Sequence, residues 1–275
     1  MPLLSTFGAA SARSFGGIGA AAAAGAGLDI NEAFSTYVYD GTGSAKTITN
    51  GTDLSGEGGM VWIKKRSGSA NHTLQDTVRG ATKHIRSSGD SSESTEAQTI
   101  TAFNSNGFSL GTDDIVNASG SDYVGWTFRK APKFFDVVTY TGNGSNRTIA
   151  HNLNCEVGMM LVKLTSGSDG WAVYHRGLDS SAPEDYRLRL DGTNARIDNT
   201  DGSRWNRTAP TSSVFSLGTD GSVNANGSTY VAYLFAHNSS DGEFGPDSDQ
   251  DVIKCGSVTI GGTGNATVNL GFEPQ

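Results

Sequence analysis

Charged residues, prolines and cysteines are all scarce in this chain of 275 residues. Asp, Glu, Lys and Arg together make up 17% of the sequence, and the long Glu-, Lys- and Leu-rich runs of helical proteins are absent. With 37 glycines and many serines, threonines and asparagines, the composition favours an all-β protein with short strands and tight turns. At this length we expect about two domains.

Basic clusters, long apolar runs and a disulfide framework are also missing. The formal net charge of −8 argues against binding of a nucleic-acid backbone, which needs clustered Lys and Arg. No apolar run approaches the length of a membrane span. Cys155 and Cys255 are too far apart for a CxxC-type metal site, and two cysteines are too few for a disulfide framework. We therefore predict two buried thiols.

The dominant feature that the chain does contain is an internal repeat. Residues 108–128 read FSLGTDDIVNASGSDYVGWTF and residues 215–235 read FSLGTDGSVNANGSTYVAYLF, with 14 of 21 positions identical. Each copy has the pattern of a short strand, a polar turn and a strongly apolar strand. Self-similarity at a fixed spacing defines the unit of folding, so the sequence predicts two copies of one domain.

The last strand of each copy has two unlike faces, because side chains alternate across a strand. One face is small, with Gly125 in the first copy and Ala232 in the second. The other face carries large apolar side chains, namely Val124, Trp126 and Phe128 in the first copy and Val231, Tyr233 and Phe235 in the second. This pattern predicts a central strand whose bulky face covers the core of a sandwich.

The matches divide the chain into units of roughly 100 residues. We place the first repeat at residues 34–133 and the second at 134–250, with Pro132 at the joint because proline cannot continue a strand ladder. Residues 66–99 are polar and variable in character, so we predict the widest loop of the first repeat there. Tandem antiparallel β-sandwiches with jelly-roll or lectin-like packing are the expected fold.

The end of the chain looks like the start of a third repeat. Residues 251–255 resemble residues 136–140, so we assign 251–275 to an incomplete copy that stops before its central strands. A fraction of a domain leaves strand edges unpaired. We expect either a longer native protein or pairing of these strands with another chain.

Residues 1–33 differ in kind from the rest and are rich in Ala and Gly. A signal peptide fits poorly, because a basic start is missing and Arg13 interrupts the apolar stretch. Such a segment cannot build its own core, so it is either an extended leader that docks on a partner or a flexible leader without a role. The docking interpretation uses five apolar anchors: Leu3, Leu4, Phe7, Phe15 and Ile18.

Catalytic and metal-binding patterns are weak throughout. His175 and the other four histidines have no Cys or acidic residue at ligand spacing, and no GxSxG motif is present. The acidic residues do not form the paired carboxylates of sandwich glycosidases. Asp247–Asp251 offers alternate carboxylates but lacks the glycine and the final glutamate of a calcium loop. We predict no enzyme activity, no cofactor and no metal site, with a polysaccharide hydrolase as the weakest alternative.

Sugar binding has one candidate in the polar segment 201–206. Sandwich lectins stack sugar faces on loop aromatics and hydrogen-bond hydroxyls with polar side chains. Trp205 is a large aromatic in this segment, and Arg204 and Asn206 flank it. These three residues are the predicted glycan or protein contact, because Trp and Arg are enriched at interfaces. The alternative for Trp205 is a loop tryptophan that caps one end of the sandwich.

The junction FRKAPKFFDVVTYTGNG at residues 128–144 resembles a repeat common in marine bacteriophage tail and other virion proteins. The opening MPLLSTFGAAS resembles the leader of many such phage proteins. Those repeats are usually described as domains of unknown function with lectin-like β-sandwich character. The resemblance covers nearly the whole chain from Phe34. It implies a virion structural role and supplies no catalytic residues.

On this basis we expect a structural protein of a phage tail or tail fibre. The leader docks on other tail proteins such as an adaptor or nozzle, and the repeats project outward for host attachment. The expected location is the virion tail, after assembly in the host cytoplasm, as a homo-oligomer with a trimer favoured. The alternative is a carbohydrate-binding module that recognises a host surface glycan. Neither interpretation involves nucleic acid or a membrane span.

Overall fold

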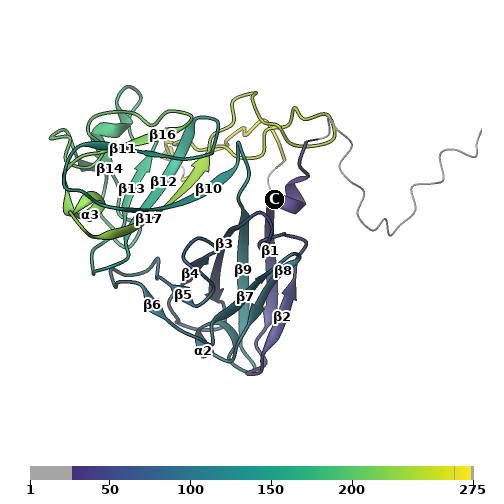
Figure 1. Cartoon of the computed structure of the whole chain (residues 1–275). Coiled ribbons are helices and arrows are strands. Elements are labelled where there is room, and N and C mark those ends of the chain that lie inside the picture. Colours follow the sequence, from purple (N-terminus) through teal and green to yellow (C-terminus); the bar gives the residue numbers. More distant parts are fainter. Residues whose placement is uncertain (1–26, 263, 274–275) are drawn as a thin grey trace, which may run out of the picture.

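The computed structural model describes residues 27–262 and 264–273 and is nearly all β, with several antiparallel sheets. The described residues form two β-sandwich units, drawn in purple to teal and in teal to green in Figure 1. This confirms the prediction of an all-β antiparallel sandwich fold. The five predicted docking anchors, from Leu3 to Ile18, lie outside the described residues.

The first unit packs a four-stranded sheet against a three-stranded sheet. The four-stranded sheet has the order β1 (Phe34–Asp40), β9 (Asp122–Arg129), β3 (Gly59–Lys65) and β4 (Thr73–Asp76). The three-stranded sheet has the order β2 (Lys46–Thr49), β8 (Gly107–Leu110) and β7 (Ile100–Asn104). The short elements of this unit are α1 (Ile30–Ala33), β5 (Lys83–His84), β6 (Ser94–Thr95) and α2 (Asp114–Asn117).

The second unit repeats the strand order of the first unit. Its four-stranded sheet runs β10 (Phe135–Thr141), β17 (Thr229–Ala236), β12 (Val157–Leu164) and β13 (Ala172–His175). Two small sheets pair β11 (Arg147–Ala150) with β16 (Val214–Leu217) and β14 (Tyr186–Arg187) with β15 (Ile197–Asp198). The helical turns are η1 (Pro183–Asp185) and α3 (Gly221–Asn224). The same order in both units is the structural counterpart of the sequence repeat.

Each sandwich has its own apolar core, and the small face of the central strand lines it. In the first unit Gly125 on β9 faces Phe108 from the opposite sheet, and a Cβ built on Gly125 would lie 3.4 Å from the ring. In the second unit Ala232 on β17 belongs to the same cluster as Phe215. A small residue is needed on the central strand because the opposite sheet contributes a phenylalanine at this position.

The bulky face of the central strand points the other way, so the prediction that it covers the sandwich core is wrong. Val231, Tyr233 and Phe235 belong to a separate buried cluster that both units share. Phe128 and Phe135 complete this cluster, with ring centroids 5.5 Å apart and each within 5.4 Å of Phe235. The outer faces of the two four-stranded sheets therefore pack on each other, and the two sandwiches form one body.

Polar contacts across the junction come from residues 66–99, which were predicted as a wide loop. This segment instead contains β4, β5 and β6, and several of its polar side chains are buried, among them Asp76, Arg79 and His84. Lys163 on β12 is buried and donates to the carbonyl oxygen of Asp90 at 3.1 Å. The segment is therefore part of the junction between the units.

The N-terminal end of the described chain packs against its C-terminal part. Leu28 forms a bridge with Phe244, and Ala33 in α1 is fully buried in the shared core. The helix α1 therefore packs on the folded body. Figure 1 shows α1 beside the yellow C-terminal segment.

No strand forms among the described residues of 251–275, so the strand expected at 251–255 is wrong. The side chain of Asn238 accepts the backbone N–H groups of Val252 and Ile253, and His237 accepts that of Cys255. The equivalent segment of the second unit is β10, which pairs with β17. The backbone N–H groups of Val252, Ile253 and Cys255 instead donate to side chains. The assignment of 251–275 to a third repeat stays a prediction.

Candidate functional site

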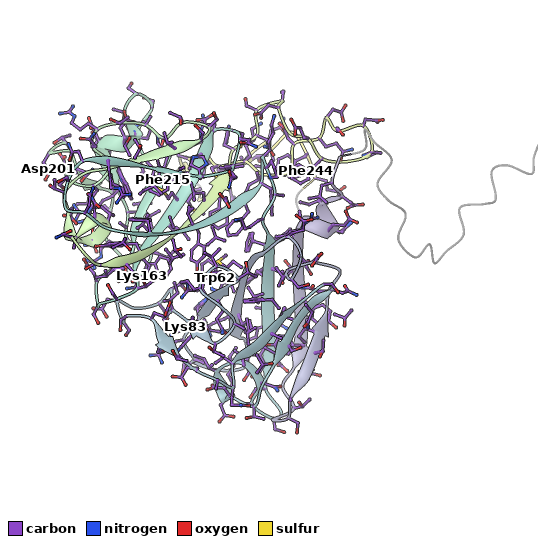
Figure 2. The ribbon with its side chains drawn as sticks, in the orientation of Figure 1. Trp62, Lys83, Lys163, Asp201, Phe215 and Phe244 are labelled. Atoms are coloured by element: carbon purple, nitrogen blue, oxygen red, sulfur yellow. The ribbon has the colours of Figure 1, made fainter. Side chains whose placement is uncertain are left out.

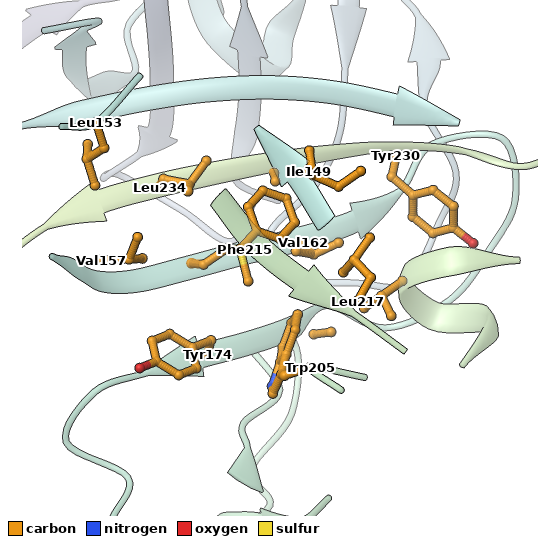
Figure 3. Close-up of a cluster of buried hydrophobic side chains, with 14 of the residues drawn as sticks. Ile149, Leu153, Val157, Val162, Tyr174, Trp205, Phe215, Leu217, Tyr230 and Leu234 are labelled. Atoms are coloured by element: carbon orange, nitrogen blue, oxygen red, sulfur yellow. The ribbon is translucent and has the colours of Figure 1, made fainter. Parts of the chain in front are cut away.

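Trp205, the predicted sugar-stacking residue, is a core residue. Its side chain is 1% exposed and lies beside Phe215 and Tyr174 in the core of the second unit (Figure 3). The indole N–H donates to the backbone oxygen of Tyr186 at 3.2 Å. A buried tryptophan satisfies its N–H in this way while its rings supply apolar contact area. This burial in the core does not fit the predicted exposed contact at Trp205.

The two neighbours of Trp205 do not share one exposed face with it. Arg204 is 16% exposed and pairs with Asp220 at 3.1 Å. Asn206 adopts a left-handed backbone conformation with φ of 51° and accepts a hydrogen bond from the amide of Asn146 at 2.6 Å. Both residues therefore hold the loop in place, and Arg204 also reaches a separate cavity that is described below.

A different pair of tryptophans lies at the rim of the shared core, on the outer face of the first unit. Trp62 on β3 and Trp126 on β9 are direct partners in the strand register, and both are half-buried. Their ring centroids are 6.2 Å apart in an edge-to-face arrangement. In Figure 2 the label of Trp62 lies between the two units. The same face continues to Val38 on the edge strand β1, whose side chain is 58% exposed.

His72 links this aromatic edge to a hollow. The indole N–H of Trp62 donates to Nδ1 of His72 at 2.8 Å. Burial lowers the pKa of His72, and the neighbouring Lys64 lowers it further, so the imidazole is neutral at pH 7. A neutral imidazole that accepts at Nδ1 carries its proton on Nε2. His72 is therefore held as a hydrogen-bond donor.

The hollow itself has a volume of about 740 Å³ and opens widely to solvent. Asn71 accepts a hydrogen bond from Ser88 at 3.1 Å, which leaves its amide N–H groups as donors. Hydrogen bonds of Lys64 to the carbonyl oxygens of Lys65 and Gly68 hold the loop after β3. The lining mixes donors, acceptors and apolar groups: Lys64, Lys65, Ser69, Ala70, Asn71, His72, Ser88, Asp114 and Ile115.

This arrangement suits a ligand with many hydroxyl groups. A few placed polar groups fix the orientation of a ligand in a pocket, and apolar or aromatic groups supply contact area. His72 and Asn71 supply donors, Asp114 supplies an acceptor, and the tryptophan edge lies next to them. The described residues thus place donors, an acceptor and an aromatic edge on one surface of the first unit.

Sequence reasoning missed this surface because no residue of β3 was singled out as a contact. Alternation along β3 puts Trp62 and Lys64 on one face and Val61 and Ile63 on the other. A lysine two residues after a tryptophan was the available signal for an open strand end. His72 could not have been assigned, because its contact with Trp62 depends on how the intervening loop folds.

The other features considered in the sequence have structural roles. His175 accepts the backbone N–H of Gly177, and the carboxylate of Asp251 accepts those of Ser240 and Gly242. Over residues 27–262 and 264–273, no three His, Cys, Asp or Glu side chains are grouped to hold a metal ion. In that same part of the chain, no helix has the length and apolar character to cross a membrane.

Fold and site together define an all-β protein of two fused sandwiches with an open polar hollow beside an aromatic edge. The chain belongs to the family described as a domain of unknown function (DUF7483), whose model matches residues 29–248. The match begins at the N-cap of α1 and ends beyond β17, so one family domain spans both sandwiches. Searches of curated proteins and of solved structures each find no match.

Proposed function

We propose that the protein is a non-catalytic structural protein of a phage tail that binds a host surface glycan in the hollow at the end of β3. The resemblance of residues 128–144 and of the opening residues to phage virion proteins supports the first part. The leader docks on other tail proteins, and the chain assembles as a homo-oligomer, with a trimer favoured. The two fused sandwiches present the hollow on the first unit.

The hydrogen bond between Trp62 and His72 carries the glycan part of the proposal. It holds a neutral imidazole with its remaining N–H as a donor at the hollow, in direct contact with an aromatic edge. A donor that is fixed before binding loses little conformational freedom when a ligand arrives, which raises affinity. Sugar hydroxyls would accept from His72 and Asn71 and donate to Asp114.

A glycan array with the host's surface polysaccharides tests this part. We expect binding by the full chain and a loss of roughly tenfold or more for His72→Phe, which keeps a ring but removes the hydrogen bonds. Tyr37→Ala is a matched control, because Tyr37 is a partly exposed aromatic on the other face of the same sheet. An array without binding, or equal binding by His72→Phe, would contradict the glycan role.

Virion assembly tests the structural part separately. Removal of residues 1–26 leaves α1 and the shared core intact, whereas removal through residue 33 would take Ala33 out of that core. We expect particles without the protein when residues 1–26 are missing, measured by mass spectrometry of purified virions. Thermal unfolding of the truncated chain should match that of the full chain. Normal incorporation of the truncated chain would contradict leader docking and leave the glycan test unaffected.

A further inference from the structure

Three arginines of the second unit converge on one small cavity. Arg187 ends β14, Arg189 follows it two residues later, and Arg204 comes from the loop before β16. All three line a cavity of about 40 Å³. The remaining lining residues are Asp169, Gly170, Trp171, Ala172 and Ser222. Three guanidinium groups around so small a space are costly to bring together, because like charges repel.

The arginines are not fully satisfied by the protein. Arg204 pairs with Asp220 at 3.1 Å, and Arg189 lies 3.8 Å from Asp191. Arg187 has no ion pair among the described residues. The Nε atoms of both Arg187 and Arg204 are buried without a hydrogen-bond partner in the described structure. Buried N–H donors are nearly always paired in proteins, so two unpaired ones at one cavity indicate a missing acceptor.

The carboxylates around the cavity are occupied by the backbone. Asp169 accepts the N–H of Gly170 at 2.7 Å, and Asp191 accepts that of Trp171 at 3.1 Å. Asp220 accepts from the N–H of Ser222 and caps the short helix α3. Formally the three carboxylates balance the three guanidinium groups, but none of them bonds Arg187.

Burial and charge make the surroundings of Arg187 unfavourable for its own positive charge. Burial lowers the pKa of Arg187, and the nearby Arg204 and Arg189 lower it further. The guanidinium keeps its proton at neutral pH, since the ordinary pKa of arginine is above 12. A bound anion would relieve this repulsion. A bound water would satisfy an N–H group but could not form an ion pair with Arg187, which no carboxylate of the described residues bonds.

We propose that this cavity binds one tetrahedral oxyanion, the sulfate or phosphate group of a ligand. Planar guanidinium groups match the oxygen atoms of such anions and bind them through paired, charge-assisted hydrogen bonds. The cavity is larger than the roughly 10–15 Å³ that a single water needs but too small for a sugar ring, so only the charged group enters. The site lies on the second unit and is separate from the hollow on β3.

Gly170 leaves space for Arg189 because glycine has no side chain. A Cβ at this position would overlap the guanidinium of Arg189, whose atoms are the nearest to it. The glycine therefore lets the guanidinium of Arg189 lie close to the backbone of Gly170, where both line the cavity. Gly170→Ala would displace Arg189 while leaving Arg187 and Arg204 in place.

Isothermal titration calorimetry with inorganic sulfate tests the site, at constant ionic strength against chloride. We expect saturable binding by the full chain and a loss of about tenfold or more in affinity for Arg187→Gln. Arg147→Gln is the matched control, because Arg147 lies on β11 of the same unit, outside the cavity lining, and its guanidinium donates to the carbonyl oxygen of Thr141. Absence of saturable binding by the full chain, or equal loss in both variants, would overturn the proposal.

A direct measurement covers the case in which Arg187→Gln does not fold. The arginine Nε–H resonances of the wild-type chain can be followed by NMR during the sulfate titration. We expect the signals of Arg187 and Arg204 to shift saturably while that of Arg147 stays fixed. Unmoved signals for Arg187 and Arg204 would overturn the proposal.

Parallel titrations distinguish the source of the oxyanion. Inorganic phosphate and a monosaccharide sulfate ester, galactose 6-sulfate, serve as probes beside inorganic sulfate. Tighter binding of the sulfate ester indicates a sulfated glycan as the natural ligand, and equal or weaker binding indicates a free anion. In either case Arg187→Gln must lower the affinity for the anion. If it does not, the anion binds somewhere other than this cavity, and the proposal is overturned.

Discussion

The guanidinium of Arg79 in the first unit donates a hydrogen bond to the hydroxyl of Tyr233 in the second unit, at 3.0 Å. The same guanidinium binds the carboxylate of Asp76 at 2.6 Å, and the hydroxyl of Tyr233 donates to that carboxylate at 2.8 Å. Asp76 and Tyr233 are fully buried. This network joins the two sandwiches and extends to Glu93, which Arg79 also contacts.

Replacement of Arg79 should destabilise the whole body. Arg79→Ala leaves the buried carboxylate of Asp76 without its cation, which costs about 3–5 kcal/mol in the free energy of unfolding. Urea unfolding measures this loss. Lys83→Ala is the matched control, because Lys83 pairs with Glu93 at the exposed rim and such pairs contribute about 0–1 kcal/mol. Similar small losses in both variants would contradict a joining role for Arg79.

Replacement of Trp205 should affect stability because its indole lies in the core of the second unit. We expect Trp205→Ala to lower the free energy of unfolding by about 3–5 kcal/mol, the usual loss for a large aromatic in a core. Thermal or urea unfolding measures it. Any glycan binding by the folded chain should survive, since Trp205 lies on the second unit, away from the hollow. A loss near zero would mean that the indole is exposed.

Replacement of Gly125 by alanine should raise stability slightly. A Cβ at this position meets the ring of Phe108 at 3.4 Å, which is close but ordinary contact, and the second unit already has Ala232 there. Glycine inside a strand costs about 0.5–1 kcal/mol relative to alanine, so the free energy of unfolding should rise by up to that amount. Gly125→Leu should lower it by about 1–3 kcal/mol through overpacking. Urea unfolding of both variants provides the comparison.

Acidification should weaken the fold as the pH falls below the ordinary histidine pKa of 6.5. Burial lowers the pKa of His84, and the positive charge of Arg86 lowers it further. The carboxylates of Glu96 and Asp113 raise it by less. The native chain then binds fewer protons than the unfolded chain, so stability is fully present above pH 6.5 and falls below it. The ring of His84 is held by the hydroxyl of Thr73 at 3.1 Å.

Urea midpoints from pH 7.5 to pH 5 measure this effect. We expect the urea midpoint to fall less with decreasing pH for His84→Gln than for the wild-type chain, because the variant lacks the histidine whose pKa is lowered by folding. The lowered pKa values of Asp179 and Asp198 do not interfere, since carboxylates with lowered pKa values lose their contribution only below their ordinary value of 3.8. Identical slopes for both chains would contradict a neutral, buried His84.

Much of the fold could be predicted from local pattern. The repeated segment placed β9 and β17 at equivalent positions, and alternation identified their unlike faces. The destination of those faces could not be predicted, because a bulky face looks the same whether it covers its own sandwich or a neighbouring one. Only the packing shows that Tyr233 and Phe128 belong to a core shared between units.

The site was predicted less well, for a physical reason that the tryptophans illustrate. Trp205 lies in a polar segment and is buried, whereas Trp62 lies in an apolar strand and is half-exposed. The exposure of a large aromatic depends on what folds over it, not on its neighbours in sequence. Arg204 was predicted as a glycan or protein contact, and the two arginines that line a cavity with it, Arg187 and Arg189, come from another part of the chain.

Local sequence pattern was enough to predict the all-β class, the internal repeat and the alternation of large and small residues on the central strands, because each depends on contacts within one unit. Tertiary structure alone decided that the two units share a core, that Arg79 meets Tyr233, and that Trp62 meets His72 beside an open hollow. These contacts join residues that are far apart in the chain or separated by a loop. Their positions follow from the packing of whole sheets, which no local pattern encodes.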